Sequence, residues 1–584
     1  MLSSARLAIV ARTVLLPLLL ALGVVLGLGS YFETSDDGSL AWMFSGVLAR
    51  QPVASVPLYM HGYGHLLAAA YTAAPAVPWL GLLLGGLLAL TSALWFAVLE
   101  RLLRPHVPPG CLMLLLVVFF GLAWLEHWLW FSHARVALLL AAGGLMFAAQ
   151  RPGRRWPLLL GLGALLAAWL IRPSLAGLGA AAAVPVAVGL AGSWRRAVPL
   201  LLSAGLLLGL AFGVAVLGQT PSDAQVQARD GQLARILDYE QLRSFPRTAA
   251  DSLGTAAISL WLLGDSGVVD PVLHSEVYRF DAADFMGRVV PAKLAQRAGL
   301  LLRDYFPVLL ALLATAGAVW YTRRNRRRGF WLVQAGFALV LIGLAGILKL
   351  PPRLALPLLD CWLVTNLVFW LHPAKTSADA CEEMAAVSAT NSSRIASSST
   401  GEGQEEMHVW PKFSPVLRYA GAAAGLLIIS LYAAKTWHRH HVLQEERQRH
   451  EEVLTIISRN VGRVRVLAGT NDLLKSLTPF RTYSLGPGPA LLLTGWPAHD
   501  TSQTRLRRAL TGTADQTECL RRLARQHSPN LEPLWFLTPE TVAWLNGRLG
   551  SGGAPVQLVP QAPSQRPGPM GTVREYRVRR VPKP

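Results

Sequence analysis

Three carboxylates lie close together just after the first apolar stretch of the chain. No charged residue occurs from Val14 to Gly29, and Glu33, Asp36 and Asp37 follow directly. Anchoring of a helix at the membrane boundary does not explain three carboxylates within five residues. One of them could accept a proton from an attacking hydroxyl or amine as a general base. Two adjacent ones could instead hold a divalent cation such as Mg²⁺ or Mn²⁺.

Basic residues stand near the ends of later apolar runs. They are Arg135 in "FSHARV", Arg172 in "WLIRPS", and Lys349 and Arg353 in "KLPPRLALP". A single basic residue at such a place usually extends to lipid headgroups. Taken as a set opposite a carboxylate, they predict a phosphate or pyrophosphate site, because guanidinium groups bind phosphate in bidentate geometry.

Two histidines occur in "MHGYGH". His61 and His65 are four residues apart, but Gly62 and Gly64 weaken a helix there, which disfavours a metal site. We expect both histidines to border an acceptor cavity, with Glu33 as support for the other two carboxylates. No residue is assigned to a metal, and a divalent cation, if present, would bind Asp36 and Asp37.

The composition indicates which elements must position these residues. The chain has 584 residues, of which 52% are hydrophobic and 15% charged, whereas soluble domains carry about 25% charged residues. Apolar runs long enough to cross a membrane, about 20 residues each, recur up to residue 435. The sequence therefore predicts an all-α polytopic membrane protein with about eleven transmembrane helices. The predicted spans are 13–30, 77–99, 111–130, 136–149, 156–171, 175–193, 197–218, 305–322, 330–348, 353–371 and 416–434.

Arginine clusters occupy alternate connections between these spans, and such clusters mark the cytoplasmic side. The N-terminus is then cytoplasmic, and the acidic triplet lies in a first outer loop, 31–76. A long outer loop spans 219–303. The net charge of +20 follows from the same clusters, and no nucleic-acid module accompanies it, so no nucleic-acid partner is expected.

The composition also divides the chain into segments. Residues 1–372 form the transmembrane domain, and residues 373–413, rich in Ser, Thr, Gly and Glu, predict a flexible cytoplasmic linker. The last transmembrane helix covers 414–437. Residues 438–584 alternate helical and strand patterns, which predicts a small extracytoplasmic α/β domain.

The order of these features resembles the GT-C class of integral membrane glycosyltransferases, which use polyprenyl-phosphate-linked sugars. The resemblance rests on "ETSDDGSLAWMFSG" after the first span, "LYMHGYGHLLAAAYTAAP", many short-looped spans, the late "KLPPRLALP" and the C-terminal domain. It covers residues 1 to about 435 in architecture and is motif-like in the first outer loop only. Many members have Asp-Glu or Asp-x-Asp where this chain has Asp-Asp-Gly.

The resemblance implies a function and roles for particular residues. One acidic residue of the first outer loop would be the catalytic base or a metal ligand, a role open to Asp36 and to Asp37. Arg172, Lys349 or Arg353 would bind the lipid phosphate. The implied reaction is inverting transfer of a hexosyl or pentosyl group to a glycan, lipid or protein of the cell envelope. It would take place among membrane lipids at the outer face of a bacterial cytoplasmic (inner) membrane.

Three alternatives remain open. A transporter or flippase of lipid-linked saccharides would keep charged residues near the membrane midplane and often shows internal repeats. Here no repeat is evident, and the polar residues gather at one face. A non-catalytic envelope-assembly protein would need no reactive site. Ligation or polymerisation of O-antigen-like chains would use similar outer loops.

Overall fold

A computed structural model describes most of the chain. It covers residues 4–49, 51–265, 267–322, 327–371, 415–459, 462–469, 471–525, 533–550, 556–561 and 573–580. The predicted linker, 373–413, lies outside these residues.

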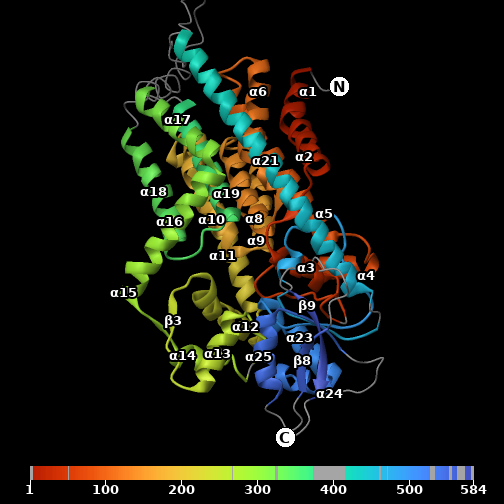
Figure 1. Cartoon of the computed structure of the whole chain (residues 1–584). Helices are drawn as coiled ribbons and strands as arrows, with labels where there is room; N and C mark the ends of the chain where they lie inside the picture. The colour runs from red at the N-terminus through yellow and green to blue at the C-terminus, as the bar shows by residue number, and fades with distance from the viewer. Residues whose placement is uncertain are drawn as a thin grey trace, which may run out of the picture.

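The described chain is mostly helical, and its long helices form a bundle with a smaller sheet-containing domain at one end (Figure 1). Seven described helical segments are long and apolar enough to cross a membrane, and the bent pair Ala282–Asp304 and Phe306–Thr322 would make an eighth. The seven segments consist of α1, η1 and α2 (Ser4–Gly27), α5 (Trp79–Leu103), α6, η2 and α7 (Pro109–Leu129), α10 (Pro173–Leu190), α11 (Trp194–Leu217), α18 (Arg327–Gly346) and α19 (Pro352–Leu371).

These helices support the prediction of a polytopic helical membrane protein, while the number of about eleven spans stays a prediction. Helices α8 (His133–Ala149) and α9 (Arg155–Ile171) have 17 residues each. At 1.5 Å per residue each is about 25 Å long, slightly less than a hydrocarbon core of about 30 Å. Helix α17 (Phe306–Thr322) is bent by 89° against the helix before it.

Helix α8 is the centre of the bundle, and nearly all of its side chains are buried. It packs against α5, α9, α10 and α19. Small residues allow this approach: a Cβ on Gly179 would lie 2.3 Å from the Leu138 carbonyl oxygen, and one on Gly144 would lie 2.8 Å from that of Gly161. Close helix packing through small residues is typical of membrane proteins.

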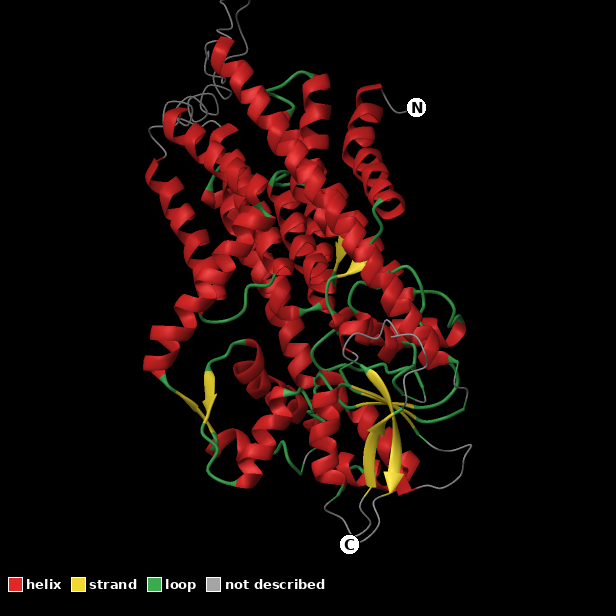
Figure 2. Ribbon diagram, in the orientation of Figure 1, coloured by secondary structure: helices red, strands yellow, loops and turns green. Residues whose placement is uncertain are grey.

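Helix α21 (Pro415–Ser458) continues from the bundle into the C-terminal domain as one helix of 44 residues (Figure 2). The sequence boundary at residue 437 therefore does not end a helix. After Gly425 no Gly or Pro occurs until the helix ends, so nothing breaks it where its composition changes from apolar to charged.

The C-terminal domain contains a five-stranded mixed sheet in the order β6-β5-β7-β9-β8. Strand β5 runs parallel to β6 and β7, and β9 runs antiparallel to β7 and β8. The strands are β5 (Arg465–Leu467), β6 (Ala490–Leu492), β7 (Leu534–Leu537), β8 (Val556–Pro560) and β9 (Arg574–Arg580), and the helices beside them include α23 (Thr501–Thr511), α24 (Gln516–Arg525) and α25 (Pro539–Leu549).

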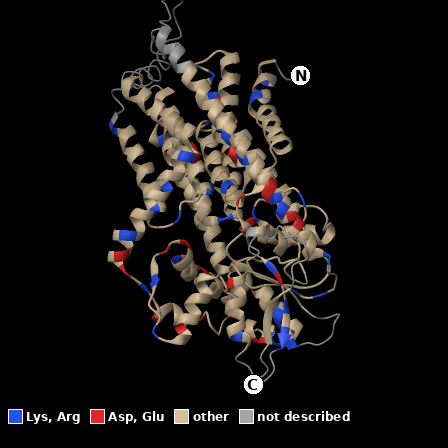
Figure 3. Ribbon diagram, viewed as in Figure 1, with Lys and Arg blue, Asp and Glu red and all other residues tan. Residues whose placement is uncertain are grey.

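The long polar segment before α17 lies at the same end of the bundle as the sheet. Its Ala257, Ile258 and Leu262 share one apolar core with Leu520 and Trp535 of the C-terminal domain. Its elements are α12 (Pro221–Leu233), η3 (Ala234–Asp238), β3 (Leu242–Ser244), α13 (Ala249–Ser259), α14 (Pro271–Glu276), β4 (Tyr278–Phe280), α15 (Ala282–Asp284), η4 (Phe285–Val289) and α16 (Val290–Asp304). Figure 3 shows acidic and basic residues on the elements at this end and also on parts of the bundle. We call it the domain-capped end, and the chain begins at the opposite end (Figure 1).

Candidate functional site

A short parallel strand pair holds the segment that carries the three carboxylates. Strand β1 (Tyr31–Phe32) pairs with β2 (Trp130–Phe131). The backbone of Phe32 also exchanges hydrogen bonds with the C-terminal domain: its N–H donates to the Leu477 carbonyl, and its carbonyl accepts from the Ser476 N–H. The carboxylates therefore lie where the bundle meets the C-terminal domain.

Asp37 is the buried member of the acidic pair. Both aspartates stand in the first turn of α3 (Ser35–Phe44), where free backbone N–H groups favour negative charge. Asp37 Oδ1 accepts a hydrogen bond of 2.8 Å from the backbone N–H of His133 and one of 2.7 Å from its Nδ1. Thr34 donates to Oδ2 at 3.3 Å. These contacts join the start of α3 to the start of α8.

Asp36 is the accessible member. A quarter of its side chain is exposed, and its Oδ2 lies 3.8 Å from a guanidinium nitrogen of Arg353. Its Oδ1 accepts a hydrogen bond of 3.1 Å from the indole N–H of Trp496, which belongs to the C-terminal domain. Because Asp36 is partly exposed, a substrate can reach its carboxylate, whereas the carboxylate of Asp37 is enclosed.

Arg172 lies on the other side of His133. Its Nη1 is 3.5 Å from His133 Nε2, and its guanidinium lies 5.0 Å above the centre of the Tyr59 ring. Pro173 follows it and disfavours helical geometry at Arg172, whose backbone is extended between α9 and α10. The Tyr59 ring also contacts the rings of His133 and Trp496, at 5.1 and 5.4 Å between centroids.

The surroundings set the protonation of two of these groups. Burial acts to raise the pKa of Asp37, but the contacts with His133 outweigh it and lower that pKa below its usual value. Asp37 is therefore a carboxylate at neutral pH. Burial raises the pKa of the Tyr59 phenol, so Tyr59 is neutral and offers its ring to Arg172.

A buried chain of polar groups continues from Glu33 into the bundle. Arg135 Nε donates to Glu33 Oε2 at 2.6 Å, and Arg135 Nη1 donates to His127 Nδ1 at 3.1 Å. His127 Nε2 then contacts Asp360 Oδ2 at 2.8 Å. Since arginine only donates, His127 carries its hydrogen on Nε2. Glu33 Oε1, Arg135 Nη2 and Asp360 Oδ1 have no partner among the residues that the structure describes.

A second cluster fastens α21 to the bundle. Arg439 donates to Glu126 at 2.7 Å and to Asp304 at 3.0 Å. The Tyr432 hydroxyl donates to the same Glu126 oxygen at 3.0 Å, and Lys435 lies 3.5 Å from Asp304. The helix that carries the C-terminal domain is thus tied to α7 and α16 by charged contacts.

The remaining sequence candidates lie elsewhere. Lys349 bonds to Asp238 of the long polar segment. His61 packs against the Trp169 ring, with centroids 5.6 Å apart, and burial lowers its pKa. His65 is exposed on α4 (Tyr63–Ala73). The structure joins none of these three to Asp36 through a described contact.

Two of the predicted residues, Asp37 and Arg172, contact His133, and two others, Asp36 and Arg353, face each other at 3.8 Å. Asp36 precedes Asp37 in the chain, which links the two pairs. Among the described residues, no group of three or more His, Cys, Asp or Glu side chains could hold a metal ion. A divalent cation at the aspartates stays a prediction.

Sequence reasoning did not assign His133, Tyr59 or Trp496 to the site. His133 stands two residues before Arg135 in "FSHARV", and Tyr59 stands two residues before His61, so both lie beside residues that it did select. Trp496 carried no signal, because only the docking of the C-terminal domain brings its indole to Asp36.

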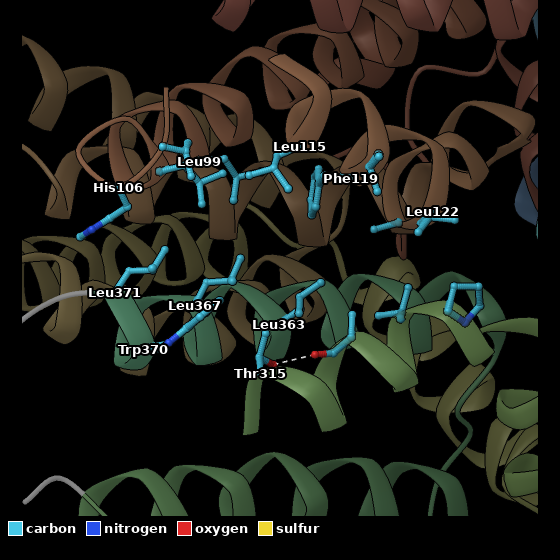
Figure 4. Close-up of a pocket in the computed structure, with 17 residues that line it drawn as sticks. Leu99, His106, Leu115, Phe119, Leu122, Thr315, Leu363, Leu367, Trp370 and Leu371 are labelled. Atoms are coloured by element: carbon cyan, nitrogen blue, oxygen red, sulfur yellow. Dashed lines mark hydrogen bonds between the residues drawn. The ribbon is translucent and has the colours of Figure 1, made fainter. Parts of the chain in front are cut away.

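A separate cavity of about 210 Å³ lies within the bundle, between α5, α6, α17 and α19 (Figure 4). Leu99, Leu115 and Leu363 are among its lining residues, and no Asp, Glu, Lys or Arg lines it. The lining is mostly apolar, which suits a hydrocarbon chain, and His106 is its one titratable side chain.

Comparisons with protein families, with characterised proteins and with solved structures find no match for this chain. What the chain does is therefore inferred from its apolar helices and from the residues around Asp36.

Proposed function

We propose that this protein is a membrane glycosyltransferase. It moves a hexosyl or pentosyl group from a polyprenyl-phosphate carrier to an acceptor of the cell envelope, with inversion at the anomeric carbon. The observation that carries the proposal is the position of Asp36, a partly exposed carboxylate 3.8 Å from Arg353 at the domain-capped end of an apolar bundle. The carboxylate and the nearby guanidinium groups supply a base and a phosphate site in one place.

The proposed reaction has one proton transfer and one substitution. Asp36 Oδ2 takes the proton of an acceptor hydroxyl, and that oxygen attacks the anomeric carbon. The bond from this carbon to the phosphate oxygen breaks, and polyprenyl phosphate leaves with both bonding electrons. Arg172 and Arg353 stabilise the departing phosphate, while Asp37 and His133 hold Arg172 in place.

The other two basic candidates already have partners. Arg135 is buried and bonded to Glu33, and Lys349 is bonded to Asp238. We therefore assign phosphate binding to Arg172 and Arg353 in the proposed mechanism. The apolar cavity within the bundle is a place where a hydrocarbon chain could be accommodated.

The test uses the purified chain in nanodiscs with a panel of radiolabelled polyprenyl-phosphate sugars. Water serves as a slow acceptor, so the natural acceptor is not needed. We expect release of free sugar from at least one donor, and release that is lost in Asp36→Asn. If every donor stays intact, the transferase proposal fails, and translocation and assembly functions become the better explanations.

One observation favours a second candidate, a transporter or flippase of lipid-linked saccharides. The chain of Glu33, Arg135, His127 and Asp360 is buried within the bundle. Ionisable groups at membrane depth often mark transport pathways. Movement of a labelled carrier across vesicle membranes that persists in Asp36→Asn and is lost in Asp360→Asn would favour this candidate.

A further inference from the structure

A single helical turn of the C-terminal domain lies against the candidate site. This turn, η6 (Trp496–His499), comes after strand β6 and begins directly after Gly495. Gly495 has a φ of +81°, a conformation that glycine adopts readily and other residues rarely. The chain therefore turns sharply at Gly495, and the first side chain after the turn is that of Trp496.

Trp496 contacts both halves of the candidate site. Its indole N–H donates to Asp36 Oδ1 at 3.1 Å, and its ring packs against the Tyr59 ring, with centroids 5.4 Å apart. The same Tyr59 ring lies 5.0 Å from the guanidinium of Arg172. One side chain of the C-terminal domain thus touches the proposed base directly and the proposed phosphate-binding arginine through one ring.

The hydrogen bond to Trp496 orients the Asp36 carboxylate. The terminal torsion of an aspartate is broad and roughly two-fold, so its rotamer preference alone does not fix the plane of the carboxylate. With Oδ1 bonded to the indole, Oδ2 is the oxygen that faces Arg353, at 3.8 Å. Oδ2 is also the oxygen that takes the acceptor proton in the proposed reaction.

Two contacts with the long polar segment hold the turn itself. The Gly495 N–H donates to the Trp261 carbonyl at 2.9 Å, and His499 Nε2 lies 2.6 Å from Asp230 Oδ1. Trp261 has a φ of +58°, which is rare for a large side chain. Backbone conformations of this kind persist where the surrounding structure fixes them, and they cluster at functional sites. The place of Trp496 therefore depends on docking of the C-terminal domain against the polar segment.

We propose that Trp496 is a positioning residue through which the C-terminal domain completes the transfer site. Docking of the domain brings the indole to Asp36, and the hydrogen bond holds Oδ2 toward the acceptor hydroxyl. The ring of Trp496 supports Tyr59 beneath Arg172 at the same time. This role rests on the proposed transferase function and adds its regulation, because the base is oriented only while the C-terminal domain is docked.

The first test is single-turnover release of labelled sugar by the full chain in nanodiscs at saturating donor. Trp496→Phe keeps an aromatic ring beside Tyr59 and removes the N–H donor. The matched control is Trp544→Phe, because Trp544 also belongs to the C-terminal domain and its indole N–H bonds to the Leu253 carbonyl of the polar segment. Small misplacements of reacting groups cost up to about a hundredfold, so we expect release by Trp496→Phe to be slower by about tenfold or more, with unchanged donor affinity, and Trp544→Phe to stay within about twofold of wild type.

A double-variant cycle separates positioning from a general structural role. If Trp496 acts through Asp36, its replacement has no further effect once that carboxylate is gone. We therefore expect Trp496→Phe combined with Asp36→Asn to release sugar at the rate of Asp36→Asn alone. A structural role would make the double variant slower than either single variant by the product of their effects.

A spectroscopic measurement tests the contact without any turnover. The chain is labelled with 5-fluorotryptophan, and the fluorine NMR signals of Trp496 and Trp544 are identified by their loss in the two phenylalanine variants. We expect Asp36→Asn to shift the Trp496 signal and to leave the Trp544 signal in place, and Asp238→Asn to shift neither.

Three results would overturn the inference: release by Trp496→Phe at the wild-type rate, multiplicative effects in the double variant, or a Trp496 signal that is unchanged in Asp36→Asn. Faster release by Trp496→Phe would also overturn it and would identify an inhibitory contact. Failure of the transferase proposal is distinguishable, because it appears as absence of release by wild type itself. A shifted Trp496 signal in Asp36→Asn would then leave the contact established and its role in sugar transfer overturned.

Discussion

Asp37 and His133 are 96 residues apart in the sequence and are joined by two hydrogen bonds to one carboxylate oxygen. The His133 N–H and Nδ1 both donate, so the ring hydrogen is on Nδ1 and Nε2 is left to face Arg172. The pair thus fixes the start of α8, the tautomer of His133 and the place of Arg172 together. Asp36, one residue earlier, is partly exposed and faces Arg353.

Replacement of Asp37 by asparagine should weaken the fold. The amide still accepts, but the hydrogen bonds to a charged carboxylate are lost, and such bonds contribute about 1.5–3 kcal/mol each. We expect a lower unfolding temperature in detergent for Asp37→Asn. The control is Asp238→Asn, which removes an acid of a partly exposed pair with Lys349. Equal unfolding temperatures for the two variants would show that Asp37 has no such role.

The acid stability of the protein should report the same carboxylate. The pKa of Asp37 is lower in the folded chain than in the unfolded chain. Its contribution is therefore complete above the unfolded pKa, about 4, and is lost as the pH falls through the lower folded value. We expect the unfolding temperature of wild type to fall more steeply below about pH 4 than that of Asp37→Asn. Parallel curves would contradict this assignment.

Arg172 should be distinguishable from a simple cation. Its guanidinium is placed by the Tyr59 ring and by His133 Nε2, and lysine lacks the planar fork that binds phosphate in bidentate geometry. We expect Arg172→Ala to weaken binding of a polyprenyl-phosphate sugar by about tenfold to a hundredfold, and Arg172→Lys to restore only part of it. Arg449→Ala, an exposed arginine of α21, should bind the donor like wild type. If Arg172→Lys binds the donor as tightly as wild type, the positive charge of this residue is sufficient and its planar geometry is not needed.

Glu33 and Arg135 form a buried ion pair whose disruption should be costly. Removal of one partner leaves an uncompensated buried charge, which costs about 3–5 kcal/mol. We therefore expect Glu33→Gln to destabilise the chain strongly in a thermal or denaturant unfolding measurement. Glu445→Gln, which breaks an exposed pair, should change stability by less than about 1 kcal/mol.

The double variant Glu33→Leu with Arg135→Met separates charge from packing. Apolar residues of similar volume often replace a buried pair without loss, so the double variant should be more stable than Glu33→Gln. If the double variant and Glu33→Gln are equally unstable, the loss of stability comes from lost packing and not from an unpaired buried charge.

The sequence predicted the local elements better than the contacts between distant segments. Apolar runs predicted the helices because each run forms its own backbone hydrogen bonds, and Asp36, Arg172 and Arg353 were chosen from their places beside such runs. Trp496 could not be found, because it lies 460 residues after Asp36 in the sequence. Only the docking of the C-terminal domain brings the two residues together. The partner of Lys349 depends in the same way on the fold of the long polar segment.

The choice between Asp36 and Asp37 shows the same limit. Two adjacent aspartates cannot be distinguished from the sequence alone. Burial separates them: Asp37 is enclosed and bonded to His133, whereas Asp36 is partly exposed and faces Arg353.

In the proposed sugar transfer, Asp36 is the base. The most direct measurement is single-turnover release of labelled sugar from the best polyprenyl-phosphate donor, comparing wild type, Asp36→Asn and the control Asp238→Asn at equal donor occupancy. General-base contributions are about 10²–10⁴-fold, so we expect Asp36→Asn to be slower by that factor while donor binding and the unfolding temperature stay close to those of wild type. Release by Asp36→Asn at the wild-type rate would contradict the account.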